Sequence, residues 1–304
     1  MNAIETSHLS RAFGRGRSTV TVVDDLNLTV PAGIVFGYLG PNGAGKTTTI
    51  RLLIGVLAPT SGHGRVAGLD LKDADGIKAR IGYANQGASV YRDLTVRENL
   101  MFKASLYLAP GAAETAVQKV LDTLELNDKR GQLAGELSGG WRQRLSIGTA
   151  VVHGPSLAFL DEPTAGLDPS ARRSLWDAIY ALCGQGTTIF VTTHYMDEAE
   201  RCHRLAMIAN GRVLAEGTPE ALKTNLGGAY YELETPDLAA ALGAARAMPG
   251  VADAWITGSS LRLAAREPLP EGTLQRLPAP PRRVLPTLED VFVALSAPVA
   301  GGRA

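Results

Sequence analysis

The sequence has few of the features that mark secreted or membrane-spanning proteins. Only two cysteines, Cys183 and Cys202, occur in 304 residues. They do not form a CxxC pair, so neither a disulfide framework nor a zinc knuckle is indicated. No apolar run approaches the roughly 18–20 residues that a transmembrane helix needs. The N-terminal residues 1–6 also lack the basic and apolar regions of a signal peptide.

Net charge is absent as well. The 30 Lys and Arg residues balance 30 Asp and Glu residues, which gives a formal charge of +0. This balance disfavours a net-basic nucleic-acid binder, and we expect no nucleic-acid partner. Hydrophobic residues make up 45% of the chain, which is enough to bury a sizeable core. Composition therefore predicts a soluble intracellular protein.

Short apolar runs alternate with helical patterns, as in a parallel sheet covered by helices. Residues 34–39, 157–160 and 187–193 are predicted strands, and each is followed by polar or glycine-rich residues. Between the first two lies a mostly helical stretch, residues 94–152, in which apolar residues recur at helical spacing. The pattern predicts an α/β fold with an inserted helical subdomain.

Composition changes near residues 226–228, so we expect two domains, 1–225 and 226–304. In the second, residues 230–234, 251–257 and 261–264 are strand-like, whereas 238–248 and 288–295 are helical. A proline-rich connector, residues 268–286, precedes the last helix. The second domain is thus predicted to be a small α+β appendage.

A phosphate-binding loop follows the first predicted strand. Its sequence, Gly40-Pro41-Asn42-Gly43-Ala44-Gly45-Lys46-Thr47, fits the pattern G-x-x-x-x-G-K-[ST]. The glycines allow backbone N–H groups to surround phosphate oxygens, while the lysine reaches the β- and γ-phosphates. The Thr47 hydroxyl is a candidate Mg²⁺ ligand. A helix after the loop would add the partial positive charge of its N-terminus.

Two carboxylates, Asp161 and Glu162, close the second predicted strand. In a parallel sheet they would emerge at the same edge as the phosphate loop. Asp161 is then a candidate partner of Mg²⁺, and Glu162 is placed to polarise the water that attacks a γ-phosphate. Taken alone, the pair would suit solvated acids at a strand end equally well. The phosphate loop makes the catalytic interpretation the better one.

His194 ends the third predicted strand and is expected at the same sheet edge. It could donate a hydrogen bond to the γ-phosphate. A lone histidine is more often structural, but this position favours a role in catalysis.

A further segment, Leu137-Ser138-Gly139-Gly140-Trp141-Arg142-Gln143-Arg144-Leu145, resembles the LSGGQ-type signature of ATP-binding-cassette (ABC) ATPases. Asp161-Glu162-Pro163-Thr164 is similar to the Walker B end of that family and residues 165–169 to its D-loop, which contains Asp168. Gln86 matches the Q-loop, His194 the H-loop, and Phe13 the aromatic residue that stacks on adenine. The resemblance covers residues 3 to 222 with every motif in family order.

This resemblance implies a P-loop NTPase of the ABC type that binds ATP and Mg²⁺. The implied catalytic residues are Glu162, His194 and Gln86, and the implied metal ligands are Thr47, Gln86 and Asp161. Nucleotide contacts are expected from Phe13, Gly40, Pro41, Asn42, Gly43, Ala44, Gly45, Lys46, Thr47, Thr48, Ser138, Gly139, Gly140 and Asp168. The sequence departs from the common family pattern at Asn85, Trp141 and His203, none of which is a catalytic group.

The signature also implies a dimer. Ser138 and the two glycines would begin a helix and expose a hydroxyl and free N–H groups to an anion. In the family that anion is the γ-phosphate on the opposite subunit, so two chains enclose two ATP molecules head to tail. Since this chain carries one copy of each motif, we expect a homodimer or a closely similar heterodimer.

Two segments indicate the branch of the family. Residues 94–99, Leu-Thr-Val-Arg-Glu-Asn, resemble the LTVxEN segment of exporter ATPases, and residues 286–292, Pro-Thr-Leu-Glu-Asp-Val-Phe, resemble the ending of ABC-2-type exporter ATPases. In transporters the region after the Q-loop receives a helix of the membrane subunit. The resemblance therefore implies ABC-2-type permease partners and a peripheral place on the cytoplasmic side of the cell membrane.

Three other classes share the phosphate loop. A GTPase or small-molecule kinase would lack residues 137–145. A chromosome- or repair-type ABC ATPase would carry a long coiled coil between phosphate loop and signature, but fewer than one hundred residues separate them here. A translation-type ABC protein usually carries two cassettes in one chain. A non-transport ABC ATPase is therefore the alternative to an export ATPase.

Overall fold

The computed structural model describes residues 1–14, 16–87 and 89–296 and divides into two units, Met1–Thr218 and Pro219–Ala304. The division falls a few residues before the expected boundary at 225. Helix α8 (Pro219–Thr224) causes this difference, because it contacts α11 (Leu288–Ser296) near the end of the chain. Residues 297–304 of the expected second domain, and Ala88 of the segment after the Q-loop, lie outside the described residues.

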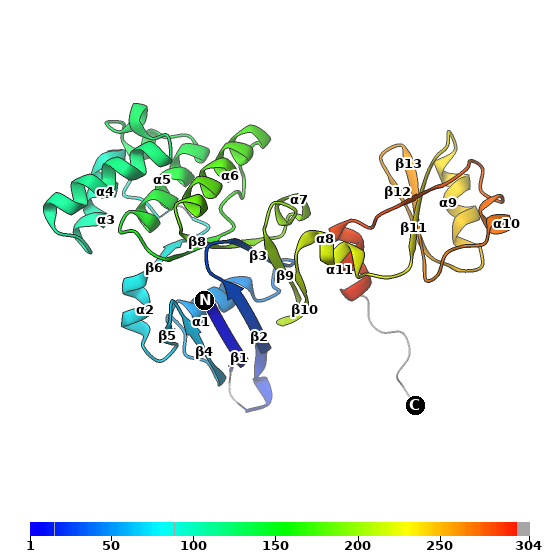
Figure 1. The fold of residues 1–304 in the computed structure, drawn as a ribbon, viewed down its shortest axis with the longest axis horizontal. Coiled ribbons are helices and arrows are strands. Elements are labelled where there is room, and N and C mark those ends of the chain that lie inside the picture. The colour runs from blue at the N-terminus through cyan, green and yellow to red at the C-terminus, as the bar shows by residue number, and fades with distance from the viewer. Residues whose placement is uncertain (15, 88, 297–304) are drawn as a thin grey trace. The chain divides into compact units, whose positions relative to one another are not determined.

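The first unit is built on a six-stranded sheet with the order β10-β9-β3-β8-β7-β6 (Figure 1). Strands β9, β3, β8, β7 and β6 are parallel, and only β10 pairs in the antiparallel sense. Their bounds are β3 Val35–Leu39, β6 Ile81–Ala84, β7 Leu157–Asp161, β8 Thr188–Thr193, β9 Arg204–Ala209 and β10 Arg212–Gly217. The three predicted strands lie side by side at its centre, so the predicted α/β class is confirmed.

A second, antiparallel sheet lies in the same unit. Its order is β2-β1-β4-β5, with bounds β1 Asn2–Phe13, β2 Val20–Pro31, β4 Ser61–Val66 and β5 Leu69–Asp70. Helices α1 (Lys46–Leu53) and α2 (Ala74–Arg80) contribute to the core between the two sheets. This sheet was not predicted.

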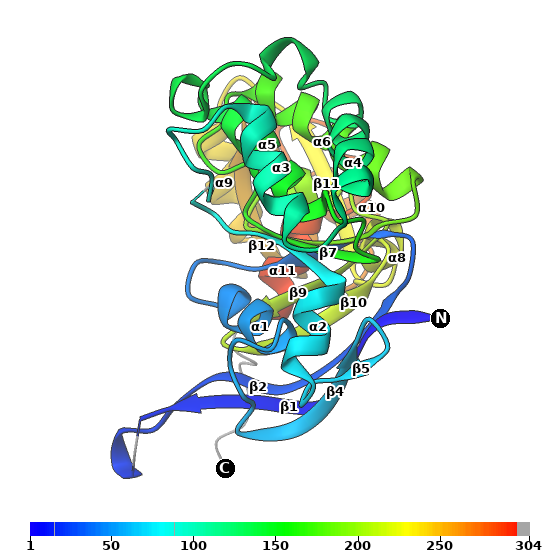
Figure 2. The same cartoon turned by 90° about the vertical axis from the view of Figure 1, so that its left-hand side faces the viewer.

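The remaining helices of the unit cover the other face of the central sheet (Figures 1 and 2). They are α3 Val96–Ser105, α4 Pro110–Thr123, α5 Gly139–Val151 and α6 Pro169–Gly184, and the short α7 Met196–Ala199 follows β8. Consecutive residues of β3 show why both faces are covered. Val35 belongs to the helix-side core and Phe36 to the core on the other face. A strand buried on both faces reads as a continuous apolar run.

The second unit is a four-stranded antiparallel sheet with the order β12-β13-β11-β14. Its strands are β11 Ala229–Glu234, β12 Val251–Thr257, β13 Ser260–Ala265 and β14 Arg282–Val284, and its helices besides α8 and α11 are α9 Leu238–Arg246 and α10 Glu271–Leu274. Ala241 and Ala245 of α9 pack into one core with β11 and β13.

The proline-rich segment 268–286 is more ordered than the sequence suggested. It contains α10 and the edge strand β14, which pairs with β11 from Tyr230↔Val284 to Glu232↔Arg282. Reading it as a connector alone was wrong. An edge strand tolerates nearby prolines because one side of it needs no ladder partner. Among the described helices of both units, none is long and apolar enough to cross a membrane.

Candidate functional site

The phosphate loop runs from the end of β3 into α1. Gly45 precedes the helix with φ of 101°, a conformation that L-residues with side chains rarely adopt. A Cβ at this position would also lie 2.7 Å from the Val22 carbonyl oxygen, so only glycine fits. The N–H groups of Lys46, Thr47 and Thr48 fall in the first turn of α1, where no intrahelical acceptor is available. The loop therefore directs a set of N–H donors toward one point.

Lys46 is buried, with 5% of its side chain exposed. Its Nζ donates to the carbonyl oxygens of Gly40 at 2.8 Å and Pro41 at 3.2 Å. It also lies 3.1 Å from Oε1 of Glu162. Burying an ammonium group is costly unless it is hydrogen-bonded and paired, and these three oxygens meet that requirement. The lysine is thus held in one position by its own loop.

Asp161 ends β7 and joins three elements. It accepts hydrogen bonds from the Thr47 hydroxyl of α1 at 3.0 Å and from the Thr192 hydroxyl of β8 at 2.6 Å. Asp161 is 3% exposed, and its bond with Thr192 is buried, whereas its bond with Thr47 is partly buried. The same Thr192 hydroxyl accepts the Glu162 N–H at 3.0 Å. The predicted meeting of Thr47 and Asp161 at one sheet edge is therefore present.

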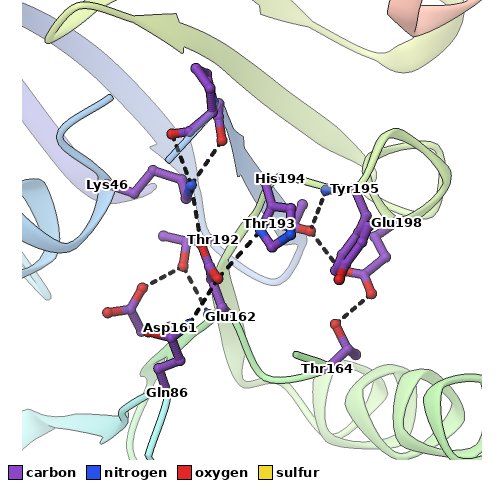
Figure 3. Close-up of polar contacts among 12 residues, drawn as sticks. Lys46, Gln86, Asp161, Glu162, Thr164, Thr192, Thr193, His194, Tyr195 and Glu198 are labelled. Atoms are coloured by element: carbon purple, nitrogen blue, oxygen red, sulfur yellow. Dashed lines mark hydrogen bonds and ion pairs between the residues drawn. The ribbon is translucent and has the colours of Figure 1, made fainter. Parts of the chain in front are cut away.

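Glu162 lies at the centre of the site (Figure 3). Its Oε2 accepts a hydrogen bond from Nε2 of Gln86 at 3.1 Å and lies 3.3 Å from Nδ1 of His194, while Oε1 faces Lys46. The carboxylate is thus surrounded by the Lys46 ammonium, the Gln86 amide and the His194 imidazole. Three residues from separate parts of the chain, Lys46, Gln86 and His194, converge on it.

The backbone of Glu162 is itself unusual. Its φ is 48°, in the left-handed region that non-glycine residues avoid. The hydrogen bond from its N–H to Thr192 helps to hold this conformation. Strained backbone of this kind concentrates at functional sites, where it directs a side chain that regular strand geometry would send elsewhere.

Two tyrosines near the site have raised pKa values. Burial raises the pKa of Tyr38, in β3, to about 12, and its hydroxyl lies 3.2 Å from that of Thr49. Burial, reinforced by the negative charge of Asp161, raises the pKa of Tyr83 on β6. Both tyrosines therefore remain neutral at physiological pH.

The oxygen atoms present fit a magnesium ion that arrives with a nucleotide. Within the described part of the chain, no group of three or more His, Cys, Asp or Glu side chains could hold a metal ion by itself. Mg²⁺ is usually held by one or two protein oxygens together with substrate phosphates and waters. Thr47 and Asp161, whose oxygens are 3.0 Å apart, supply such a pair.

Other predicted site residues lie apart from this cluster. Ser138 precedes α5 and is exposed, and its side chain makes no capping hydrogen bond. Gly139 and Gly140 form the first turn of that helix. Asp168 caps α6, with Oδ1 accepting the N–H groups of Ser170 and Ala171 at 2.9 Å.

Phe13, at the end of β1, is 38% exposed, and the Arg11 guanidinium lies 4.6 Å from its ring centre. Within the described chain, neither Phe13 nor Ser138 forms a hydrogen bond or ion pair with the Glu162 cluster. A single chain thus brings together Lys46, Thr47, Gln86, Asp161, Glu162 and His194, but not the signature.

Sequence reasoning missed three contributors. Thr192 and Thr193 were recognised only as the end of a strand, and Glu198 was not singled out. Thr192 bonds both site carboxylate residues, as described above. Thr193 accepts the Tyr195 N–H at 3.0 Å and donates to Glu198 at 2.7 Å. The only available signal was a pair of hydroxyl residues directly before a strand-terminal histidine.

The known proteins that resemble this chain share its cassette region. A sequence profile described as "ABC transporter" matches residues 23–165. The daunorubicin/doxorubicin resistance ATP-binding protein DrrA of Streptomyces peucetius is 46% identical over 239 residues, which cover 77% of this chain and 71% of that protein. The Nod factor export ATP-binding protein I of Paraburkholderia xenovorans is 41% identical over 239 residues and 77% of each chain.

Solved structures agree on the fold. The dimeric ATP-binding cassette MJ0796, in a post-hydrolysis state bound to ADP and Pi, superposes with a TM-score of 0.64 at 22% identity. The match covers 71% of this chain and 98% of that one. At this level of identity the likeness establishes the fold of the cassette.

Proposed function

Because the chain belongs to the ABC transporter family and is an ATPase of that family, we propose that it powers an ABC-2-type exporter through separate membrane subunits. The observation that carries the proposal is the Glu162 carboxylate, held among Lys46, Gln86 and His194 beside a phosphate loop. The export branch rests on residues 94–99 and 286–292, and on relatives named for drug resistance and Nod factor export. Loss of ATP turnover on substitution of Glu162 by glutamine tests the ATPase role on which the proposal depends.

In this proposal the phosphate loop binds the β- and γ-phosphates of ATP. Residues Gly40 to Thr48 supply N–H groups and the Lys46 ammonium, and Phe13 stacks on adenine. Mg²⁺ would be held by Thr47, Asp161 and Gln86 together with the phosphates, where it supplies charge neutralisation for phosphoryl transfer. Phosphate oxygens compete with Glu162 for Lys46, so nucleotide binding releases the carboxylate from its ion pair.

Hydrolysis then requires an oriented water. A released Glu162 carboxylate accepts a proton from the attacking water, while His194 donates a hydrogen bond to the γ-phosphate. Gln86 links the site to the segment that begins at β6. Positioning and charge stabilisation carry most of the catalysis in phosphoryl transfer, because little covalent chemistry is left for the protein.

A dimer completes the site in this proposal. The Ser138 hydroxyl is exposed and does not cap its own helix, so it is free to bond a phosphate outside the chain. The N–H groups at the start of α5 add a partial positive charge. Two copies related by a twofold axis would each supply this signature to the phosphate loop of the other, with Asp168 near the shared nucleotides.

The substitution Ser138→Arg tests the dimer. In a Glu162→Gln background with ATP, we expect size-exclusion chromatography to show a dimer, and the added Ser138→Arg to return the chain to a monomer. The arginine would place a bulky side chain in the closed interface, while ATP affinity of the single chain stays unchanged. Thr115→Arg, which replaces another hydroxyl residue by arginine at an exposed position of α4, is the control. A persistent ATP-dependent dimer in Ser138→Arg would contradict the proposed interface.

The membrane partner is proposed to dock at a groove beside the Gln86 segment. A hollow of about 480 Å³ is lined there by Tyr83, Val90, Tyr91, Phe102 and Leu106, among others. Tyr91, Phe102 and Leu106 are 58%, 44% and 60% exposed, which is unusual for a cluster of large apolar side chains. An apolar helix of an ABC-2-type permease suits this groove. Docking there would place the chain at the cytoplasmic side of the membrane.

Phe102→Glu is expected to prevent stable association with the membrane subunit. A charge in the apolar groove would have to be desolvated on docking, at a cost of about 1–3 kcal/mol or more. Copurification of the chain with a co-expressed ABC-2-type permease measures the effect. Val56→Glu, which places the same charge at another exposed apolar position (57% exposed), should copurify as wild type does. Equal recovery of both variants with the permease would count against the groove.

A further inference from the structure

A buried polar cluster lies next to the site. It connects the turn after β7, the end of β8 and helix α7. Thr164, Thr193 and Glu198 are each 1% exposed. The Glu198 carboxylate accepts hydrogen bonds from the Thr164 hydroxyl through Oε1 and from the Thr193 hydroxyl through Oε2, at 2.7 Å in the second case (Figure 3). Each carboxylate oxygen therefore holds a different segment of the chain.

The two threonines belong to segments that carry proposed catalytic groups. Thr164 lies two residues after Glu162, in the turn that leads toward Asp168. Thr193 directly precedes His194, and its carbonyl oxygen accepts the N–H of Gly40, the first residue of the phosphate loop, at 3.2 Å. A single buried carboxylate thus fixes the Glu162 turn relative to the end of β8.

Arg172 of α6 extends the connection. Its Nε lies 3.4 Å from Oε1 of Glu198, and its guanidinium lies 4.4 Å from the centre of the Tyr195 ring. Tyr195 in turn packs on His194, with ring centres 4.1 Å apart. The helix that begins after Asp168 therefore contacts both the carboxylate and the aromatic pair that contains His194.

We propose that Glu198 is a positioning residue, which holds Glu162 and His194 in the relative geometry that ATP hydrolysis needs. Its carboxylate is buried and acts through Thr164 and Thr193. A buried carboxylate with two hydroxyl donors and one cation is expensive to leave partly unpaired, so the cluster has one strongly preferred arrangement. Arg172 links that arrangement to α6 and so to the proposed dimer interface.

The inference rests on the proposed ATPase function and is tested by kinetics of the full chain. Glu198→Gln keeps the size of the side chain but loses its charge and one acceptor oxygen, and Thr164→Val removes one donor. We expect each to lower kcat by about 10- to 100-fold, because small misplacements of catalytic groups have effects of that size. The dissociation constant for ATP, measured by equilibrium binding without turnover, should stay within about twofold, because neither residue contacts the phosphate loop through its side chain.

Three further variants separate positioning from general stability. Thr164→Ser keeps the hydroxyl and should restore most of the wild-type kcat. The double variant Thr164→Val/Glu198→Gln should lose less kcat than the product of the two single losses, because both changes act on one hydrogen-bonded cluster. Asp197→Asn alters an exposed neighbour that also faces Arg172, at 3.5 Å, and should leave kcat within about twofold of wild type.

Several outcomes would overturn the inference. One is a wild-type kcat in folded Thr164→Val or Glu198→Gln, and another is a parallel loss of kcat, ATP affinity and melting temperature in both. If Glu198→Gln does not fold, comparison of kcat between Thr164→Val and Thr164→Ser tests the positioning role by itself. A different result would contradict the proposed function itself, namely ATP hydrolysis by Glu162→Gln at the wild-type rate. An inactive Glu162→Gln beside a fully active Thr164→Val would reject only the positioning role.

Discussion

Glu162→Gln is expected to lower ATP turnover by about two to four orders of magnitude, the usual contribution of a positioned general base. The amide keeps the shape of the side chain but cannot accept a proton from water at useful rates. Phosphate release from the purified chain measures turnover. Glu5→Gln, the same change on an exposed strand residue, is the matched control.

The same variant should retain ATP binding and hold it more firmly. In the wild-type chain the Glu162 carboxylate lies 3.1 Å from the Lys46 ammonium, which must be released before it can engage phosphate. Removing the negative charge removes that competitor, so the dissociation constant for ATP should fall or stay equal. ATP should also accumulate in a closed dimer. Near wild-type turnover in Glu162→Gln would remove this residue from its proposed role.

Lys46→Ala is expected to weaken ATP binding by about 100-fold, which corresponds to about 2.7 kcal/mol. A hydrogen bond to a charged group contributes about 1.5–3 kcal/mol, and the preorganised Lys46 should provide at least one. Its Nζ is already fixed by the carbonyl oxygens of Gly40 and Pro41, so little side-chain entropy is lost when phosphate binds.

Equilibrium titration with ATP measures the loss of affinity in Lys46→Ala. Lys78→Ala is the control, because Lys78 is half-exposed and forms a surface ion pair with Asp75 at 3.3 Å. The melting temperature should be recorded for both, since Lys46→Ala also leaves the Glu162 carboxylate without its cation. Unchanged affinity for ATP in Lys46→Ala would contradict the assignment of the phosphate loop.

The effects on Lys46 and Glu162 are coupled, because each is the other's charge partner. In a Glu162→Gln background, Lys46→Ala no longer exposes an unpaired carboxylate, so its cost in thermal stability should be smaller than in the wild-type background. Its cost in ATP affinity should persist, since that depends on phosphate and not on Glu162. Comparing the two costs of Lys46→Ala, in thermal stability and in ATP affinity, between the two backgrounds separates the structural ion pair from the proposed contact with phosphate.

Several elements could be predicted from the sequence because their signals are local. The apolar runs at 34–39, 157–160 and 187–193 became β3, β7 and β8 with shifts of one residue at most. Strands buried on both faces produce such runs whatever surrounds them. Short or edge strands were harder. β14 spans only Arg282–Val284 within a proline-rich segment, and its pairing with β11 is decided by tertiary contact.

The sequence by itself determined the chemistry of the site. The phosphate-loop pattern, the acidic pair after an apolar strand and the signature each require particular residue types at fixed spacing, so one sequence is enough to recognise them. In this way the sequence pointed to Lys46, Asp161, Glu162 and His194 as candidates. It also led us to expect that the ends of neighbouring strands bring them together.

Tertiary structure alone decided how these groups are oriented. The left-handed backbone of Glu162, the two hydrogen bonds of Thr192 and the Glu198 link between Thr164 and Thr193 depend on β7, β8 and α7 meeting in space. Glu198 has no motif around it, since its partners lie 34 and 5 positions away in sequence. Residue type sets what a side chain can do, whereas the direction of a hydrogen bond depends on where the fold places its partner.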